Sequence, residues 1–374
     1  MDPEKKYPIL AHLLSPYGKR HRKTLGLVTA AITATGVARS FAVATTMMVW
    51  LGVRLASALQ RFYRLLQNPR IDYTELVATL AQALCRNPAR HLLIPIDWTE
   101  WHHGLRLLMA SVVVGKRGVP LFSQAFAQRI WRRSQNTREN TFLRVLADAL
   151  HRAGVSATIL CDRGFRRVSW LQLLQTLRLG FAVRLMSDVY VELAPGVKVP
   201  LADILLTQGQ VLDLGPVPLR ADGAATVRVI GYWAPGAHEP WWVATSETCA
   251  ARRVLKLYDR RMTVEELFRD AKGCRFGGKL FWTQFRDPEA LAHFLALLGV
   301  ALLIWILIGI AAARRDPSLR LRSRTKGPRQ SYVTIGVRIA ASGGGHPRWT
   351  RAAVGRVLEP PALRQVAGAA VGGK

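Results

Sequence analysis

The chain has 374 residues, half of them apolar and 11 of them Trp, so it can bury a sizeable core and is not disordered. Lys and Arg outnumber Asp and Glu by 53 to 24, a formal net charge of +29 at pH 7. This excess predicts attraction to a polyanion, with nucleic acid favoured over an anionic membrane surface. The four cysteines show no CxxC or Cys/His spacing, which argues against a zinc site and a disulfide framework.

Residues 1–90 predict an all-helical N-terminal unit. The start mixes charges of both signs and has no long apolar stretch before residue 24, so it does not resemble a secretory signal, and we expect a cytoplasmic protein. With nucleic acid as the favoured polyanion, it would be nucleoid-associated. Residues 54–68 repeat Leu and aromatic residues at helical spacing, with Arg61 and Arg64 between them. Each of these arginines could face a partner, or could cover apolar surface with its stem.

From residue 91 the pattern changes to short apolar runs. An antiparallel meander followed by strands that alternate with helices predicts an α/β fold of the RNase H-like type, a mixed sheet with helices on both faces. Gly115 and Gly118 are expected at the turn between the second and third strands. The expected strands cover residues 91–99, 105–114, 119–123, 156–161 and 180–185, and the expected helices cover residues 139–153 and 166–178.

Two carboxylates stand at strand ends in this arrangement. Asp97 closes the first strand, and Asp162 directly follows the strand over residues 156–161. In open α/β sheets, active sites form beyond the carboxyl ends of the strands, so the two side chains are expected to approach one another. Taken alone, each aspartate could equally serve a turn or a helix cap.

Residues 186–245 predict a β-rich insertion between the two parts of the core, residues 91–185 and 246–313. Strand-like runs such as residues 226–233 and 241–245 are separated by Pro and Gly. Trp241 begins the last of these runs. A tryptophan in this place either packs in the core or presents its ring to a ligand.

The segment from residue 258 to residue 272, called here the signature segment, combines four polar groups on one predicted helix face. At 100° per residue, Tyr258, Arg261, Glu265 and Lys272 form one stripe, while Glu266 points away. A carboxylate flanked by cations suits a metal ligand beside phosphate groups. The alternative is a solvated helix face with an Arg261–Glu265 ion pair.

The spacing Tyr-x2-Arg-x3-Glu-x6-Lys resembles the signature of a large family of bacterial insertion-sequence transposases with an RNase H-like Asp-Asp-Glu core. Ile-Asp-Trp-Thr at residues 96–99 and Asp-Arg-Gly-Phe at residues 162–165 resemble the two aspartate motifs of that family. The resemblance covers roughly residues 55–340. It implies that Asp97, Asp162 and Glu265 are catalytic and hold two Mg²⁺ ions, for which Mn²⁺ can substitute.

The same resemblance implies a set of DNA contacts and partners. Phosphates would be held by Tyr258, Arg261 and Lys272, and a base flipped out at the transposon end would stack on Trp241. Further contacts are expected from Arg163 and, in a helical N-terminal DNA-contacting domain, from Arg61 and Arg64. The expected partner is double-stranded DNA, both transposon terminal repeats and target, bound by a homodimer that follows a cut-and-paste route.

Residues 291–313 carry no charge and are long enough to span a bilayer, with Arg314 and Arg315 following. A buried core helix is apolar all round as well, and we favour that interpretation, with no membrane partner. Residues 314–374 are basic and rich in Gly and Pro, which predicts a partly disordered tail, although residues 331–338 could be ordered.

Three alternatives to an active transposase remain open from the sequence. One is a catalytically inert, DNA-binding relic that acts as a repressor. Another is an RNase H-like nuclease, which would share the three carboxylates but would cut without specific ends. The third is an inner-membrane protein with one span at residues 291–313.

Overall fold

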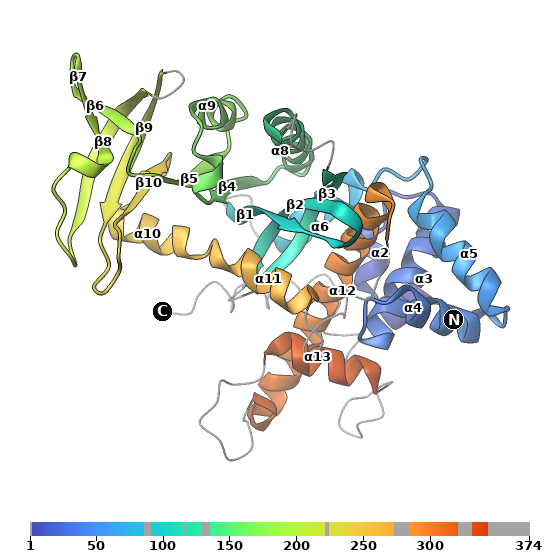
Figure 1. Ribbon diagram of the computed structural model, residues 1–374. Helices are drawn as coiled ribbons and strands as arrows, with labels where there is room; N and C mark the ends of the chain where they lie inside the picture. The colour runs from blue at the N-terminus through green and yellow to red at the C-terminus, as the bar shows by residue number, and fades with distance from the viewer. Residues whose placement is uncertain are drawn as a thin grey trace.

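The computed structural model describes residues 2–85, 91–114, 117–128, 135–220, 224–272, 285–320 and 331–342. Within these ranges the chain forms one mixed ten-stranded sheet with helices packed around it (Figure 1), which confirms the predicted α/β fold class. The strand order is β3-β2-β1-β4-β5-β10-β9-β8-β6-β7. The strands are β1 (His91–Glu100), β2 (Leu105–Val114), β3 (Arg117–Ala127), β4 (Ser156–Cys161), β5 (Gly180–Leu185), β6 (Tyr190–Ala194), β7 (Val197–Pro200), β8 (Val211–Arg220), β9 (Ala224–Tyr232) and β10 (Trp241–Thr245).

Strand pairing follows the RNase H-like order in the first half of the sheet. Strands β1, β2 and β3 form the antiparallel meander, and β1, β4 and β5 run parallel to one another. Strand β10 then pairs antiparallel with β5, and β9 pairs with β10. The strands of the predicted insertion therefore continue the core sheet and do not form a sheet of their own.

Helices cover the first half of the sheet on both sides. In Figure 1, α8 (Gln135–Arg152) and α9 (Val168–Thr176) lie on one side, and α10 (Ala251–Asp259) and α11 (Met262–Lys272) run end to end along the other. Among the described residues there are also short 3₁₀ helices: η1 (His102–Gly104), η2 (Arg163–Phe165), η3 (Leu201–Asp203) and η5 (Pro317–Arg320).

The described part of the N-terminal unit is helical throughout, with α1 (Pro3–Lys6), α2 (Ile9–Leu13), α3 (Lys19–Thr35), α4 (Ser40–Leu51), α5 (Leu55–Leu66) and α6 (Thr74–Leu84). Gly52 ends α4 in the left-handed conformation that an L side chain rarely adopts. Helix α5 buries Ala58, Phe62 and Leu65, spaced as one face of a helix. The Phe62 ring meets Phe294 edge-on at 5.7 Å, which ties the unit to the core.

Helix α12 (Pro288–Arg315) is the apolar segment for which the sequence left two interpretations. Its length and composition would allow it to cross a membrane, yet 94% of its most apolar 18-residue window is buried inside the protein. Strand β3 and helices α3 and α13 (Tyr332–Ala341) pack against it. This burial is what the core-helix interpretation predicts. Helices α3 and α4 together are also long and apolar enough for a membrane span, but they are bent by 111° at the break between them.

Helix α13 lies in the basic C-terminal region, over the residues for which the sequence left order open. It crosses α12 so closely that a Cβ on Gly309 would lie 1.9 Å from Tyr332 O, and one on Gly336 would lie 1.8 Å from Trp305 O. Only glycine permits this backbone approach. The ordered interpretation of residues 331–338 is therefore confirmed, while residues 321–330 and 343–374 lie outside the described residues.

Gly118 is a second correction, because it lies inside β3 opposite Val113 and not in a turn. A Cβ on Gly118 would lie 2.9 Å from Thr263 O and 3.3 Å from Leu267 Cβ, so the missing side chain lets α11 pack on the strand. Gly115 lies outside the described residues. Of the cysteines, Cys161 and Cys249 are free thiols, and Cys274 falls outside the part that the structure describes.

Candidate active site

The two predicted aspartates lie on neighbouring parallel strands. Ile96 of β1 pairs with Cys161 of β4, so Asp97 and Asp162 are the next residue on each strand. Asp97 does not end its strand as expected, since β1 continues to Glu100 in its pairing with β2. The aspartate instead stands where β1 passes beyond the end of β4. Asp162 leaves the sheet and caps η2, its Oδ1 accepting a hydrogen bond from Gly164 N at 2.8 Å.

The signature segment is two helices, which corrects the expectation of one continuous helix. Helix α10 ends at Asp259 and α11 begins at Met262. The turn between them is tight, because Arg261 N donates to Tyr258 O and Thr263 N donates to Arg260 O, each three residues back. The Thr263 hydroxyl also donates to Arg260 O at 2.8 Å, and such local side-chain bonds compete with the helical pattern.

Arg261 connects the first aspartate to the glutamate of the signature segment. Its Nη1 lies 3.5 Å from Asp97 Oδ2, and its Nη2 donates to Glu265 Oε1 at 2.8 Å. The guanidinium side chain is only 13% exposed. Glu266 contacts a different element, Arg117 of β3, at 3.5 Å. The predicted divergence of Glu265 and Glu266 is therefore present on α11.

The electrostatics of Asp97 show that the three carboxylates share one region. Burial, followed by the negative charge of Asp162 and more weakly that of Glu265, raises the pKa of Asp97 to about 6. The backbone N–H of Trp98, which donates to Asp97 Oδ1 at 2.8 Å, and the charge of Arg261 act in the opposite direction. Asp162 and Glu265 are thus both close enough to act on Asp97.

Within the described ranges, no three His, Cys, Asp or Glu side chains are arranged closely enough to hold one metal ion as they stand. The chemistry of the donor set nevertheless fits Mg²⁺ or Mn²⁺, which prefer carboxylate oxygens. Burial and, after it, repulsion from Asp162 raise the pKa of Asp97, and a bound divalent cation would offset both. In this conformation the Arg261 guanidinium is the positive charge that contacts Asp97 and Glu265.

Tyr258 and Trp241 meet beside these carboxylates. Tyr258 is 3% exposed, and burial raises its pKa to about 12, while the charges of Arg261 and Arg184 lower it. The Trp241 ring meets the Tyr258 ring edge-on at 5.6 Å, and the Arg184 guanidinium lies 5.6 Å from the Trp241 ring centre. Arg184 was missed from the sequence, although a lone charge inside the apolar run of β5 is a usable signal.

Of the remaining predicted DNA contacts near the carboxylates, the structure describes the side chain of Arg163 but not that of Lys272. Arg163 lies on η2, directly after Asp162, and its guanidinium is 3.4 Å from the carboxylate of Glu239. The same carboxylate contacts Arg184 at 2.6 Å. The side chain of Lys272 lies outside the described residues.

Glu139 was also missed by the sequence analysis. This carboxylate of α8 is fully buried, accepts a hydrogen bond from Trp98 Nε1 at 2.8 Å and pairs with Arg167. Trp98 follows Asp97, and Arg167 follows η2. One buried ion pair therefore connects the segments that carry the two aspartates, and the sequence offered no signal for it beyond the amphipathic pattern of the helix.

Arg61 and Arg64 line a groove of about 710 Å³ in the N-terminal unit. Further cations in its lining are Arg20, Lys23 and Arg70, and none of the described residues that line it is a carboxylate. In Figure 1, the helices α3 and α5 that form it lie at the opposite end of the molecule from β6, β7 and β8.

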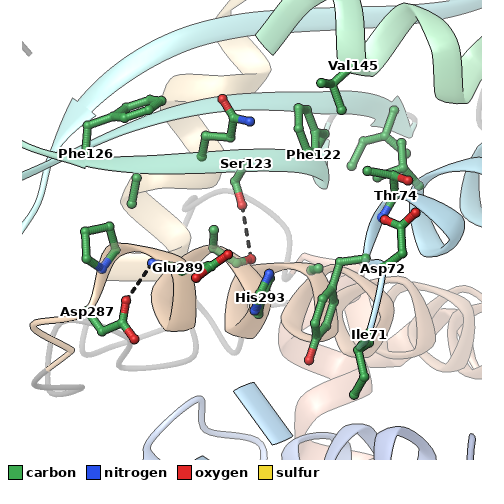
Figure 2. Close-up of a pocket in the computed structure, with 18 of the residues that line it drawn as sticks. Ile71, Asp72, Thr74, Phe122, Ser123, Phe126, Val145, Asp287, Glu289 and His293 are labelled. Atoms are coloured by element: carbon green, nitrogen blue, oxygen red, sulfur yellow. Dashed lines mark hydrogen bonds between the residues drawn. The ribbon is translucent and has the colours of Figure 1, made fainter. Parts of the chain in front are cut away.

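A cavity of about 820 Å³ lies between the N-terminal unit, β3 and the start of α12 (Figure 2). Two of its carboxylates serve local structure, since Asp287 accepts from Glu289 N at 3.0 Å and Asp72 from Thr74 N at 2.8 Å. His293 stacks on Tyr73 with ring centres 4.0 Å apart. None of Asp97, Asp162 and Glu265 lines this cavity, so it is separate from the candidate site.

Comparison with protein families gives a match over the residues that form this site. The family model described as "Transposase DDE domain" matches residues 90–303, a range that includes both aspartates and Glu265. No curated protein matches the chain.

Proposed function

The chain belongs to the transposase DDE domain family, and from this premise we propose that it cuts DNA at the ends of an insertion sequence and joins them to target DNA. The reaction would be a divalent-metal-dependent hydrolysis followed by transesterification, along a cut-and-paste route. The observation that carries the proposal is the contact of Arg261 with both Asp97 and Glu265, while the charge of Asp162 acts on Asp97.

Each carboxylate has a distinct support in the protein. Asp97 is held by its strand and by the Trp98 N–H, Asp162 by its cap on η2, and Glu265 by α11. These residues would hold two Mg²⁺ ions, or Mn²⁺ in their place. When bound, the metal would activate a water or a 3′-hydroxyl and stabilise the leaving oxygen of an in-line displacement.

The cations near the carboxylates would position the DNA. Arg261 already contacts two carboxylates, so its guanidinium could turn to a phosphate once metal ions neutralise them. Lys272 would hold a further phosphate, and Trp241, supported edge-on by the buried Tyr258, would stack on an unpaired base. The net charge of +29 supports a nucleic-acid substrate, and the basic groove that contains Arg61 and Arg64 would contact the duplex away from the cut.

In the proposed complex, two protein copies hold the two terminal repeats and the target DNA. We also propose that the protein acts in the cytoplasm, at the nucleoid, because its substrate would be chromosomal DNA. The burial of α12 inside the protein supports its role as a core helix.

The test uses a supercoiled plasmid that carries the DNA found on either side of the gene, incubated with the purified chain and Mg²⁺. The proposal predicts cuts at the ends of the element and joining of those ends to a second plasmid. Binding without any cutting in Mg²⁺ or Mn²⁺ would instead indicate an inert relic. Cutting that ignores the ends would indicate an RNase H-like nuclease.

A further inference from the structure

Glu239 is an acidic side chain beside a site that should bind a polyanion. Its Oε1 lies 2.6 Å from Arg184 Nη2 and 3.4 Å from Arg163 Nη1, so one oxygen faces two guanidinium groups. Arg184 belongs to β5 of the core, Arg163 directly follows Asp162, and Glu239 lies in the loop between β9 and β10. Two arginines that converge on one carboxylate oxygen are arranged as they would be around a phosphate oxygen.

The loop holds Glu239 in place through its own contacts. A turn precedes it, in which Ala237 N donates to Ala234 O at 3.0 Å and Trp233 Nε1 donates to Ala237 O at 2.9 Å. Pro240 follows and restricts Glu239 to extended backbone conformations. The carboxylate is therefore presented to the arginines by a braced loop.

The surroundings of the two arginines connect them to the candidate active site. The Arg184 guanidinium lies over Trp241, and its charge acts on Tyr258, as does that of Asp162. Arg184 is 20% exposed, whereas Glu239 is 56% exposed. An incoming anion can therefore reach the arginines by displacing a side chain that is largely in water, and exposed ion pairs of this kind are weak.

We infer that Arg163 and Arg184 form a phosphate-binding site for the DNA strand that enters the active site, and that Glu239 occupies this site in the free protein. The inference rests on the proposed function, because it takes DNA as the ligand. DNA binding then exchanges the Glu239 carboxylate for a backbone phosphate. Glu239 competes with the substrate and lowers the affinity of the chain for DNA.

The experiment measures the dissociation constant for a short DNA duplex in Ca²⁺, in a buffer free of phosphate. Glu239→Gln keeps the size of the side chain and removes its charge. Asp203→Asn is the matched control, since it removes the same charge from an exposed position in the same insertion. Arg184→Ala and the double variant Arg184→Ala/Glu239→Gln complete a mutant cycle. Thermal melting checks that each variant folds.

Glu239→Gln should bind DNA about three- to tenfold more tightly than the parent, the range expected for releasing an exposed ion pair. Asp203→Asn should give a clearly smaller gain, and Glu239→Gln should give none in the Arg184→Ala background. A gain no larger than that of Asp203→Asn, or weaker binding, would overturn the inference. A parent that binds the duplex but never cuts it would contradict the proposed function and leave this result standing.

Discussion

The two halves of the sheet differ in how they are covered. In the core half, β4 is buried from Ala157 to Cys161 and lies between parallel neighbours under α8. In the insertion half, β7 has no buried residue, and the exposed apolar side chains include Tyr190, Leu193 and Val197. The core half therefore fixes its side chains through packing on both faces, while the insertion half leaves much of its surface open.

This difference assigns separate tasks to the two halves. A metal-binding carboxylate has to be held within a fraction of an ångström, which a doubly covered strand end provides. In the proposed function, DNA would need an accessible surface, which the insertion and its loop beside Trp241 would provide. We therefore expect substitutions in the core half to change catalysis and folding, and substitutions in the insertion half to change DNA affinity with folding preserved.

The largest effect is expected at the core aspartates. Asp97→Ala and Asp162→Ala should each reduce strand cleavage by roughly a thousandfold or more, because a lost metal ligand removes several kcal/mol of transition-state stabilisation. DNA binding in Ca²⁺ should stay close to that of the parent, since neither side chain is a phosphate contact. Single-turnover cleavage and a binding titration measure the two quantities. Near-normal cleavage by either variant would remove that residue from the site.

The next effect concerns the stability of the core half. Glu139→Ala should lower the free energy of unfolding by about 3–5 kcal/mol, because it leaves Arg167 without its buried partner. Asp148→Ala, on the same helix, removes an exposed pair with Arg152 and should cost no more than about 1 kcal/mol. Denaturant unfolding measures both variants. Equal losses would mean that the Glu139 network adds nothing to the core beyond an ordinary surface pair.

The pH dependence of the free energy of unfolding should carry a component from Asp97, in the core half. Its folded pKa of about 6 lies above the ordinary value of 3.8, so between these pH values the folded protein binds more protons than the unfolded chain. Stability should therefore fall as pH rises through this window, by at most about 3 kcal/mol, in protein freed of metal by a chelator. Asp97→Asn should lack this component. Parallel curves of unfolding free energy against pH for parent and variant would refute the assignment.

The smallest of these effects belongs to the insertion half. Trp241→Ala should weaken binding of a transposon-end duplex by about 1–3 kcal/mol if its ring stacks on a base, while Trp241→Phe should retain part of that affinity. Tyr190→Ala, an exposed aromatic on β6, is the control and should bind like the parent. A fluorescence titration measures affinity, and melting confirms folding. If Trp241→Ala binds normally, the ring serves only to pack against Tyr258.

The sequence predicted those elements whose cause is local. Strands β4 and β5 have the predicted bounds because each is a short apolar run between turn residues, and the place of Asp162 after β4 follows from the same pattern. The features that were missed depend on partners far along the chain. Gly118 lies in a strand because it pairs with Val113 of β2, and α11 packs on it from far along the chain. Arg184 meets Glu239 only once β5 and β10 are paired.

The break in the signature segment has a different origin. Helical periodicity placed Glu265 and Glu266 on different sides, and that expectation survives because α11 itself is regular. Periodicity could not reveal the tight turn at Arg260 and Arg261, which three-residue hydrogen bonds and the Thr263 hydroxyl produce. Tyr258 is consequently carried by another helix than Glu265, and it is buried.

The central claim is that Glu265 acts with Asp97 and Asp162 at one catalytic site, and the most direct measurement compares Glu265→Gln with Glu266→Gln. The two variants make the same chemical change on adjacent residues of α11, one beside Arg261 and Asp97 and the other beside Arg117. In single-turnover cleavage of an end-containing duplex with Mg²⁺, Glu265→Gln should abolish product and Glu266→Gln should retain most of it. Equal losses at unchanged melting temperature would contradict the account.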